Sequence, residues 1–309
     1  MARMPALLVL LSSTACLQAR EPHHFKEPMK LGGKMVAAET LNHGERAYML
    51  YCRACHGEKG DAKGPAAPGL RPPPRDFTLG IFKFAAVPGG TLPHDEDIVR
   101  IVRGGLHGTA MLNWDGVPER DLAAIVQYIK TFSPRWKEEE PGEAIVPTPD
   151  PWKGKEEAGV TRGRKLYHGL AQCLGCHPSY ASRQEIYAAS KELTGNGTTD
   201  FRDDMYGSVL KESDYGVKIL PPDFTRSDLR SIRPDHQLED IYRVVASGVG
   251  GTAMPTWRGS LPEEDVWALA HYVDTLVGMK DQPSARQLLA RNQAADQSWK
   301  PPPAPPRTN

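Results

Sequence analysis

The chain has 309 residues, of which 39% are hydrophobic and 25% are charged, and its 38 Lys and Arg residues balance its 38 Asp and Glu residues. The formal net charge of zero excludes the basic surface typical of nucleic-acid-binding proteins, and it gives no strong electrostatic attraction to a membrane surface. The length allows two modest domains with separate cores, and the 29 glycines and 28 prolines favour domains rich in loops.

The first residues, 1–19, resemble a secretory signal peptide. Arg3 supplies a positive start, residues 6–11 have the sequence ALLVLL, and small residues follow this apolar run. The alternative is an apolar start without a targeting role. No other stretch approaches the roughly 18 apolar residues that a membrane-spanning helix needs, so we expect an exported protein without a membrane span.

Cys16 directly follows the small residues of this segment, and in this place it resembles the lipidated cysteine of a bacterial lipoprotein signal. The match is imperfect, because such signals prefer leucine where this chain has Ser13. The alternative is a cysteine that is lost with the signal, for example by cleavage after Ala19.

The other four cysteines form two copies of one motif, C-x-x-C-H. The first copy is CRACH at 52–56 and the second is CLGCH at 173–177. Chance predicts only about 0.003 copies of such a motif in a chain of this composition. The two copies therefore indicate a function, and zinc binding, thiol–disulfide exchange and haem attachment are the candidates.

Zinc is disfavoured because the two cysteine pairs lie 121 residues apart, and because zinc gives no reason for a histidine after each second cysteine. A redox pair is expected beside a βαβ pattern, and none is visible. C-x-x-C-H is typical of covalent haem attachment, and on a helical turn its two cysteines and its histidine share one face. We predict two haem c groups, with thioether bonds from Cys52, Cys55, Cys173 and Cys176 and with axial ligands His56 and His177.

The repeat extends on both sides of the motifs and predicts an all-α fold. Gly44 and Tyr48 correspond to Gly163 and Tyr167. Gly44 with Tyr128, and Gly163 with Tyr272, suggest close crossings of the first and last helix of each copy. Segments 96–103 and 239–246 are expected to be short helices that end at glycine. Longer helices are expected after Pro118 and Pro262, where apolar residues recur at i, i+3, i+4 and i+7. No strand pattern of any length is visible.

A methionine stands at the same place in each copy, in the sequence GTAM. Met111 and Met254 are therefore the predicted second axial ligands, and a thioether ligand raises the reduction potential of haem iron. His107 is the alternative ligand in the first copy, because it lies four residues before Met111. Trp114 and Trp257 follow the methionines by three residues and are expected to pack on the haem, to bond a propionate, or simply to fill the core.

Three further segments lie outside the repeated pattern, two beside the copies and one within the second copy. Residues 133–160 are rich in Pro and Glu and are expected to form a linker, and residues 281–309 are expected to be a disordered Pro-rich tail. The interval from histidine to methionine is 55 residues in the first copy and 77 in the second. The extra stretch, 180–215, is either a partner contact or a long surface loop, and it carries four tyrosines: Tyr180, Tyr187, Tyr206 and Tyr215.

These motifs resemble the class I c-type cytochromes in a tandem di-haem arrangement, over about 42–132 and 161–278. The haem motifs are highly specific, and the methionine sequences are moderately so. The resemblance implies domains at 40–132 and 161–280, each with a few helices wrapped around a covalently bound haem, and it implies periplasmic electron transfer. The chain departs from the compact family pattern in its long linker and its long second loop.

The resulting hypothesis is a periplasmic electron carrier without catalytic residues, either free or a subunit of a respiratory complex. Its donor would be a quinol-oxidising complex or a dehydrogenase, and its acceptor an oxidase or a reductase. No nucleic acid is expected as a partner, and contact with a membrane is expected only through a lipid anchor or a membrane complex. The main alternative is a di-haem peroxidase with one open haem site, against which the two matched methionines argue. A thiosulfate-oxidising enzyme with a cysteine ligand is less favoured, because no cysteine is left over near either motif.

Overall fold

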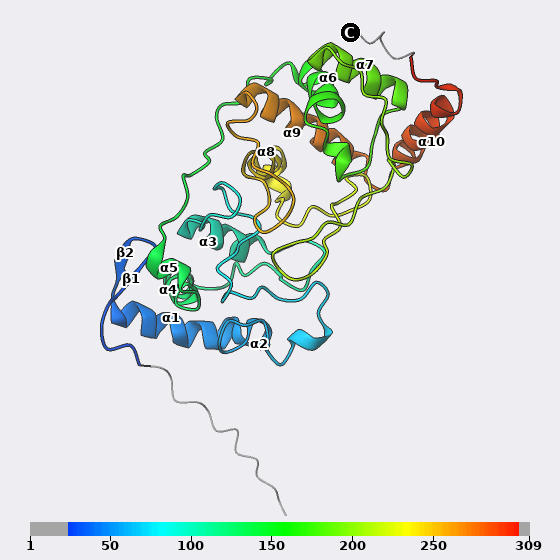
Figure 1. The fold of residues 1–309 in the computed structure, drawn as a ribbon. Helices are drawn as coiled ribbons and strands as arrows, with labels where there is room; N and C mark the ends of the chain where they lie inside the picture. The colour runs from blue at the N-terminus through cyan, green and yellow to red at the C-terminus, as the bar shows by residue number, and fades with distance from the viewer. Residues whose placement is uncertain (1–23, 303–309) are drawn as a thin grey trace, which may run out of the picture.

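The computed structural model describes residues 24–302, and they form two helical domains that lie side by side (Figure 1). The first domain, residues 24–142, contains α1, α2, η1, α3, α4 and α5. The second domain, residues 143–302, contains α6 to α10 and three short turns, η2 to η4. The all-α prediction is confirmed, with one small hairpin as the exception. The bounds of the elements are β1 Met29–Leu31, β2 Lys34–Val36, α1 Ala38–Tyr51, α2 Arg53–His56, η1 Ala67–Gly69, α3 Asp95–Gly104, α4 Glu119–Lys130, α5 Arg135–Glu138, α6 Glu156–Lys165, η2 Leu166–Leu170, η3 Cys173–Gly175, α7 Arg183–Thr194, η4 Pro234–His236, α8 Gln237–Ser247, α9 Glu263–Gly278 and α10 Pro283–Ser298.

The same helix crossing supports both domains. In the first domain, α1 packs against α4, and a Cβ atom added to Gly44 would lie 2.2 Å from the carbonyl oxygen of Ala124. In the second domain, α6 packs against α9, and the corresponding distance from Gly163 to the oxygen of Ala268 is 1.9 Å. Only glycine lets the two backbones approach so closely. The predicted close crossings are confirmed.

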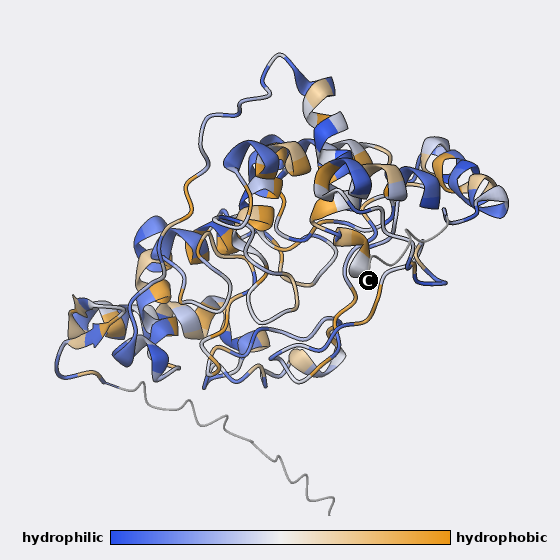
Figure 2. Cartoon of the chain, turned by 45° about the horizontal axis from the view of Figure 1, so that its top comes forward, coloured by the Kyte–Doolittle hydropathy of each residue, from blue (hydrophilic) through white to orange (hydrophobic). Residues whose placement is uncertain are grey.

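The helices that were expected around the methionine sequences are all present. α3 and α8 begin at or close to the expected residues, and both end before a glycine with a positive φ angle, Gly105 at 67° and Gly248 at 74°. α4 and α9 follow Pro118 and Pro262, with acidic residues in their first turns. Blue and orange alternate around the helices in Figure 2, which is the pattern of amphipathic helices that bury one face.

The first core extends beyond the predicted limits of 40–132. Leu31 and Val36 lie before these limits, and both side chains are buried in the first core. They belong to β1 and β2, which pair antiparallel, so the prediction of no strand is wrong for residues 29–36. Two glycines with positive φ, Gly32 and Gly33, form the turn. Three-residue strands are too short to give a periodic sequence signal.

The predicted linker, 133–160, is attached to both domains. Trp136 of α5 is buried in the first core, and Ile145 is buried in the second. The amide of Ile145 also donates a hydrogen bond of 2.7 Å to the carbonyl oxygen of Ala86 in the first domain. α6 begins within this segment, at Glu156. Residues 133–160 therefore include parts of both domains.

The prediction of a disordered tail at 281–309 is wrong for residues 283–298, because these form α10. α10 packs against α7, and the carboxylate of Asp296 accepts hydrogen bonds from the amide of Arg183 at 2.7 Å and from the hydroxyl of Tyr206 at 2.8 Å. The proline run that suggested disorder begins only after this helix.

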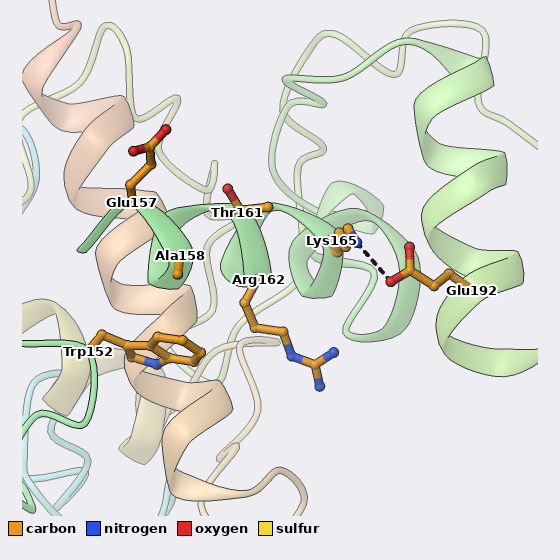
Figure 3. A pocket seen from close by; sticks show the side chains of 7 residues that line it. All are labelled: Trp152, Glu157, Ala158, Thr161, Arg162, Lys165 and Glu192. Carbon is orange, nitrogen blue, oxygen red and sulfur yellow. Dashed lines mark hydrogen bonds and ion pairs between the residues drawn. The ribbon is translucent and has the colours of Figure 1, made fainter. Parts of the chain in front are cut away.

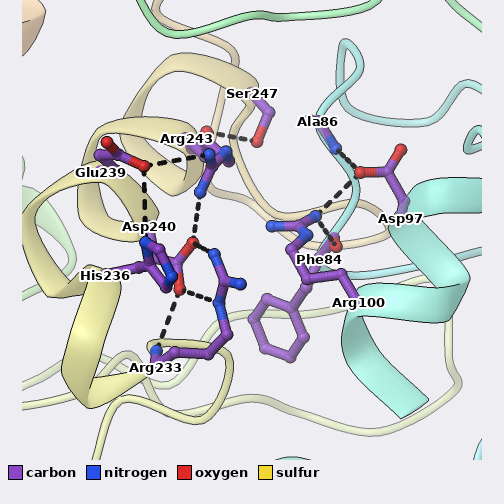
Figure 4. Close-up of polar contacts among 10 residues, drawn as sticks. All are labelled: Phe84, Ala86, Asp97, Arg100, Arg233, His236, Glu239, Asp240, Arg243 and Ser247. Atoms are coloured by element: carbon purple, nitrogen blue, oxygen red, sulfur yellow. Dashed lines mark hydrogen bonds and ion pairs between the residues drawn. The ribbon is translucent and has the colours of Figure 1, made fainter. Parts of the chain in front are cut away.

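The two domains meet through corresponding elements. Figure 4 shows α3 facing α8, with Asp97 and Arg100 on one side and Asp240 and Arg243 on the other. Arg100 donates to Asp97 at 2.8 Å. Burial lowers the pKa of the Arg100 guanidinium, and the positive charges of Arg243 and Arg233 lower it further. The same positions of the repeat thus face each other, as in an approximate twofold arrangement.

Among residues 24–302, no helix has the length and apolarity needed to cross a membrane. The predicted signal peptide and Cys16 lie outside the described residues.

Candidate haem sites

Each C-x-x-C-H motif lies on one helical turn of its own. In the first motif, the amides of Cys55 and His56 bond the carbonyl oxygen of Cys52 at 3.3 and 3.0 Å. In the second, the amides of Cys176 and His177 bond the oxygen of Cys173 at 3.0 and 2.9 Å. These i,i+3 and i,i+4 bonds place the cysteines and the histidine on one side of the turn, as the sequence predicted.

Each histidine of the motifs is held by one nitrogen. His56 Nδ1 lies 2.9 Å from the carbonyl oxygen of Arg75, and His177 Nδ1 lies 2.9 Å from that of Pro222. A carbonyl oxygen only accepts, so Nδ1 carries the proton and donates it. Burial lowers the pKa of both imidazoles and favours their neutral form. The lone pair of Nε2 is then free to bind iron.

Two aromatic contacts fix the same rings in the same way. Phe77 stacks on His56 with ring centroids 4.6 Å apart, and Phe224 stacks on His177 at 4.8 Å. These phenylalanines belong to the repeated Asp-Phe-Thr sequence that directly follows the carbonyl partners. Each repeated DFT therefore packs against the histidine of its own domain.

A buried tyrosine anchors the end of each motif. The hydroxyl of Tyr48 donates to the carbonyl oxygen of Gly57 at 2.8 Å, and that of Tyr167 donates to the oxygen of Pro178 at 2.9 Å. In both domains the acceptor is the residue directly after the histidine. The conformation of the turn is thus tied to the helix before it.

Burial favours the neutral thiol in the first cysteine of each motif. Cys52, Cys55, Cys173 and Cys176 form no disulfide, and burial raises the pKa of Cys52 and of Cys173 to about 12. A site that disfavours thiolate fits a thioether better than zinc, which binds thiolate. In addition, no group of three or more His, Cys, Asp or Glu side chains within residues 24–302 is arranged to hold a metal ion by itself.

The predicted methionine ligands lie in two loops with the same geometry, which we call the first methionine loop (105–114) and the second methionine loop (248–257). The amide of Leu106 bonds the oxygen of Met111 at 2.8 Å, and the amide of Val249 bonds that of Met254 at 3.3 Å. A threonine hydroxyl in each loop accepts from the methionine amide, at 3.0 and 3.2 Å. Both methionine side chains are half-buried. The axial roles of Met111 and Met254 remain predictions that this shared geometry favours.

Each methionine loop also contacts the opposite domain. The amide of His107 donates to the oxygen of Arg230 at 2.9 Å, and the amide of Gly250 donates to the oxygen of Lys83 at 3.0 Å. His107 and Gly250 are equivalent positions of the repeat, and so are Lys83 and Arg230, each six residues after the stacked phenylalanine. The His107 side chain is exposed, which favours Met111 as the ligand.

The two tryptophans lie where core packing and a haem contact are both open. Trp114 packs on the first core and meets Tyr51 edge-on at 6.3 Å, and Trp257 packs on the second core. Their amides bond the preceding helices at the oxygens of Val102 and Ala246. Core packing is confirmed for both side chains, and the propionate bond stays a prediction.

A family model described as cytochrome c oxidase, cbb3-type, subunit III matches residues 39–129 and 158–273, about two thirds of the chain. The chain belongs to this family. Among solved structures, a chain of the reducing HAO-like protein complex of Kuenenia stuttgartiensis is similar, with 31% identity and a TM-score of 0.58, over 76% of this chain and 96% of that one. Comparison with curated proteins gives no significant match.

Membership of the cbb3-type subunit III family implies covalently bound haem c and haem-based electron transfer. The residues fit this cofactor: each matched region contains two half-buried thiols and a neutral imidazole with a free Nε2. The predicted resemblance to tandem c-type cytochromes is therefore confirmed.

Two tyrosines of the insertion at 180–215, Tyr180 and Tyr215, contact other parts of this cytochrome. Tyr180 is buried, and its hydroxyl accepts from the amide of Phe224 at 2.8 Å and donates to Asp223 at 3.0 Å. Tyr215 reaches the first domain, where the guanidinium of Arg75 lies 3.9 Å from its ring centre. The sequence pointed to neither contact, because the first depends on packing within the second domain and the second depends on how the two domains pack.

A surface hollow of the second domain lies apart from these motifs. Figure 3 shows its seven lining residues, among them Trp152, Arg162 and the ion pair of Lys165 with Glu192. The lining contains no cysteine, histidine or methionine. This hollow therefore has no part in holding either haem.

Proposed function

We propose that this cytochrome is a periplasmic di-haem protein that carries single electrons between redox partner proteins. Bound haem c supplies an iron that accepts and releases one electron without making or breaking a bond. One electron enters at one domain, passes to the other domain, and leaves to an oxidised partner. The observation that carries the proposal is the reciprocal contact of the two methionine loops, each bonded to the opposite domain.

This contact gives the two sites a fixed relation. The bonds from His107 to Arg230 and from Gly250 to Lys83 connect equivalent positions, so each methionine loop lies against the opposite domain. α3 and α8 face each other at this interface, and each carries an internal Asp–Arg ion pair, Asp97 with Arg100 and Asp240 with Arg243 (Figure 4). Hydrogen bonds from both methionine loops to the opposite domain support transfer within the chain.

The chain's own residues would hold each iron with both axial positions filled. His56 and His177 are oriented by their carbonyl partners and by the stacked phenylalanines, and they would each bind one face of an iron. Met111 and Met254 would bind the opposite faces. With both faces filled, peroxide finds no open position, and the site is limited to electron transfer.

The partners are redox proteins of the respiratory chain. A quinol-oxidising complex or a dehydrogenase would be the donor, and an oxidase or a reductase the acceptor. The similar chain from Kuenenia stuttgartiensis comes from a protein complex, which supports a role within an assembly. Residues 1–19 would direct export, and lipidation of Cys16 would keep the protein near membrane-bound partners.

The test is a stoichiometric titration of the haem-loaded chain. We expect two electrons to be taken up per chain and then released fully to an oxidised acceptor, with no turnover of hydrogen peroxide. The double variant Cys52→Ala/Cys55→Ala and the matching variant Cys173→Ala/Cys176→Ala should each take up one electron. Peroxide turnover, or an uptake of one electron by the unchanged chain, would contradict the proposal.

A further inference from the structure

The two histidine sites differ in one side chain. Arg75 and Pro222 provide the same carbonyl bond, 2.9 Å from the Nδ1 atoms of their histidines, and Asp-Phe-Thr follows both. The backbone role is thus shared, but only the first site places a cationic side chain next to the histidine. The positive charge of Arg75 already acts on His56, because it contributes to the lowered pKa of that imidazole.

Arg75 is held by a residue of the other domain. Its guanidinium lies 3.9 Å from the ring centre of Tyr215, within the range of a cation–π contact. Tyr215 is the last of the tyrosines in the segment that lengthens the second copy, and the first copy has no counterpart. The second domain therefore supplies a support for the first histidine site, and the first domain supplies none of this kind in return.

Tyr215 is itself fixed to the second methionine loop. Its hydroxyl donates to the carbonyl oxygen of Gly250 at 2.9 Å, and the amide of Asp214 donates to the oxygen of Gly251 at 3.0 Å. A Cβ atom added to Gly251 would lie 2.9 Å from the tyrosine ring, so the glycine is needed for this close approach. The ring is thus part of a rigid interface.

The surroundings of Arg75 are positive on balance. The ammonium of Lys83 lies 4.9 Å from the centre of the same ring, and Arg230 is close enough to influence Lys83. Burial, together with the charges of Arg75 and Arg230, lowers the pKa of Lys83 to about 8. The nearby carboxylates are Asp76, which accepts hydrogen bonds from Thr78, and Asp214 beside the tyrosine.

We propose that Tyr215 is a positioning residue that holds the charge of Arg75 against the first axial histidine, and thereby keeps the reduction potential of the first haem above that of the second. This inference rests on the proposed di-haem function. A fixed positive charge in a poorly solvated place disfavours the ferric state, which carries one more positive charge than the ferrous state. Without the ring, water would surround the guanidinium and would screen its charge.

The test is a spectroelectrochemical titration of the haem-loaded full chain and its variants. In Tyr215→Leu, we expect the potential of the first haem to fall by about 59 mV, equal to a tenfold change in its one-electron equilibrium constant. Tyr215→Leu and Tyr215→Phe both lose the hydroxyl bond to the second methionine loop, so any shift of the second haem should be the same in the two variants. Tyr215→Phe should retain most of the effect, because the ring stays, and Arg75→Leu should reproduce the fall.

Two controls make the result specific. Tyr187→Leu removes a tyrosine of the same insertion that lies on α7 and should leave both potentials unchanged. Met111→His marks which of the two waves belongs to the first haem, because a second histidine lowers its potential. Haem content, measured for every variant as the pyridine haemochrome, separates the two hypotheses. Two haems per chain with an unmoved first wave in Tyr215→Leu would overturn the positioning role alone, and fewer than two haems in the unchanged chain would overturn the proposed function as well.

Discussion

Gly163 gives the sharpest test of the fold that holds the second haem site. In Gly163→Ala, the new Cβ atom would lie 1.9 Å from the carbonyl oxygen of Ala268 and 2.8 Å from the Cβ of Tyr272. The obstacle is helix backbone, so α6 and α9 must move apart by more than about 1 Å, on the order of the shortfall from an ordinary contact. Overpacking of this kind costs about 1–3 kcal/mol, and we expect the upper end.

The assay is urea and thermal unfolding of the haem-loaded protein, followed by far-UV circular dichroism. A loss of about 3 kcal/mol corresponds to a fall in Tm of roughly 6–12 °C for a protein of this size. Gly278→Ala is the matched control, because it lies at the end of the same α9 and a Cβ there meets nothing within 4 Å. If both variants unfold within about 0.5 kcal/mol of each other, the close helix crossing does not have the role that we assign to it.

Three further changes test other contacts. Tyr167→Phe removes the hydroxyl that anchors the second motif and should lower the free energy of unfolding by about 1 kcal/mol in urea titration, whereas an unchanged value would mean that the bond contributes nothing. Asp240→Asn leaves Arg233 without its buried charge partner and should cost about 3 kcal/mol by the same measurement, while the exposed Glu212→Gln should change stability by less than about 0.5 kcal/mol, as expected of surface pairs. Burial lowers the pKa of His168 from about 6.5 to about 4, so the unfolded chain binds a proton first, and stability should be full above pH 6.5 and fall by up to roughly 3 kcal/mol towards pH 4. His168→Gln should remove this slope from the pH dependence of Tm, and a slope that persists would assign it to other groups.

The local features of the sites could be predicted from the sequence. C-x-x-C-H fixes its own geometry within one helical turn, and the repeated glycines and tyrosines mark the helix crossings in the sequence alone. The repeat carries this information because two copies of a weak signal, such as GTAM, are stronger than one. The two GTAM sequences do form loops with the same backbone hydrogen bonds, to the carbonyl oxygens of Met111 and Met254.

The features that depend on contact between the domains could not be predicted. Tyr215 carries no sign in the sequence that its ring lies under Arg75, because the two residues are far apart in the chain and belong to different copies. α10 was not predicted, because the proline run that follows it suggested disorder for the whole segment. The helix packs on α7 through the carboxylate of Asp296, and the sequence does not show this contact. The hairpin at 29–36 is stabilised by packing on Trp136, and propensity has little part in it.

The most direct test of the closed, electron-carrying sites is the oxidised optical and near-infrared spectrum of the haem-loaded chain. The intensity of the methionine–ferric haem charge-transfer band, divided by the haem content, counts the irons that Met111 and Met254 bind. Two equivalents per chain are expected, one for each methionine loop. One or none would mean that a haem is bound by another ligand such as His107 or is open, and would contradict the assignment of a closed histidine–methionine pair to both sites.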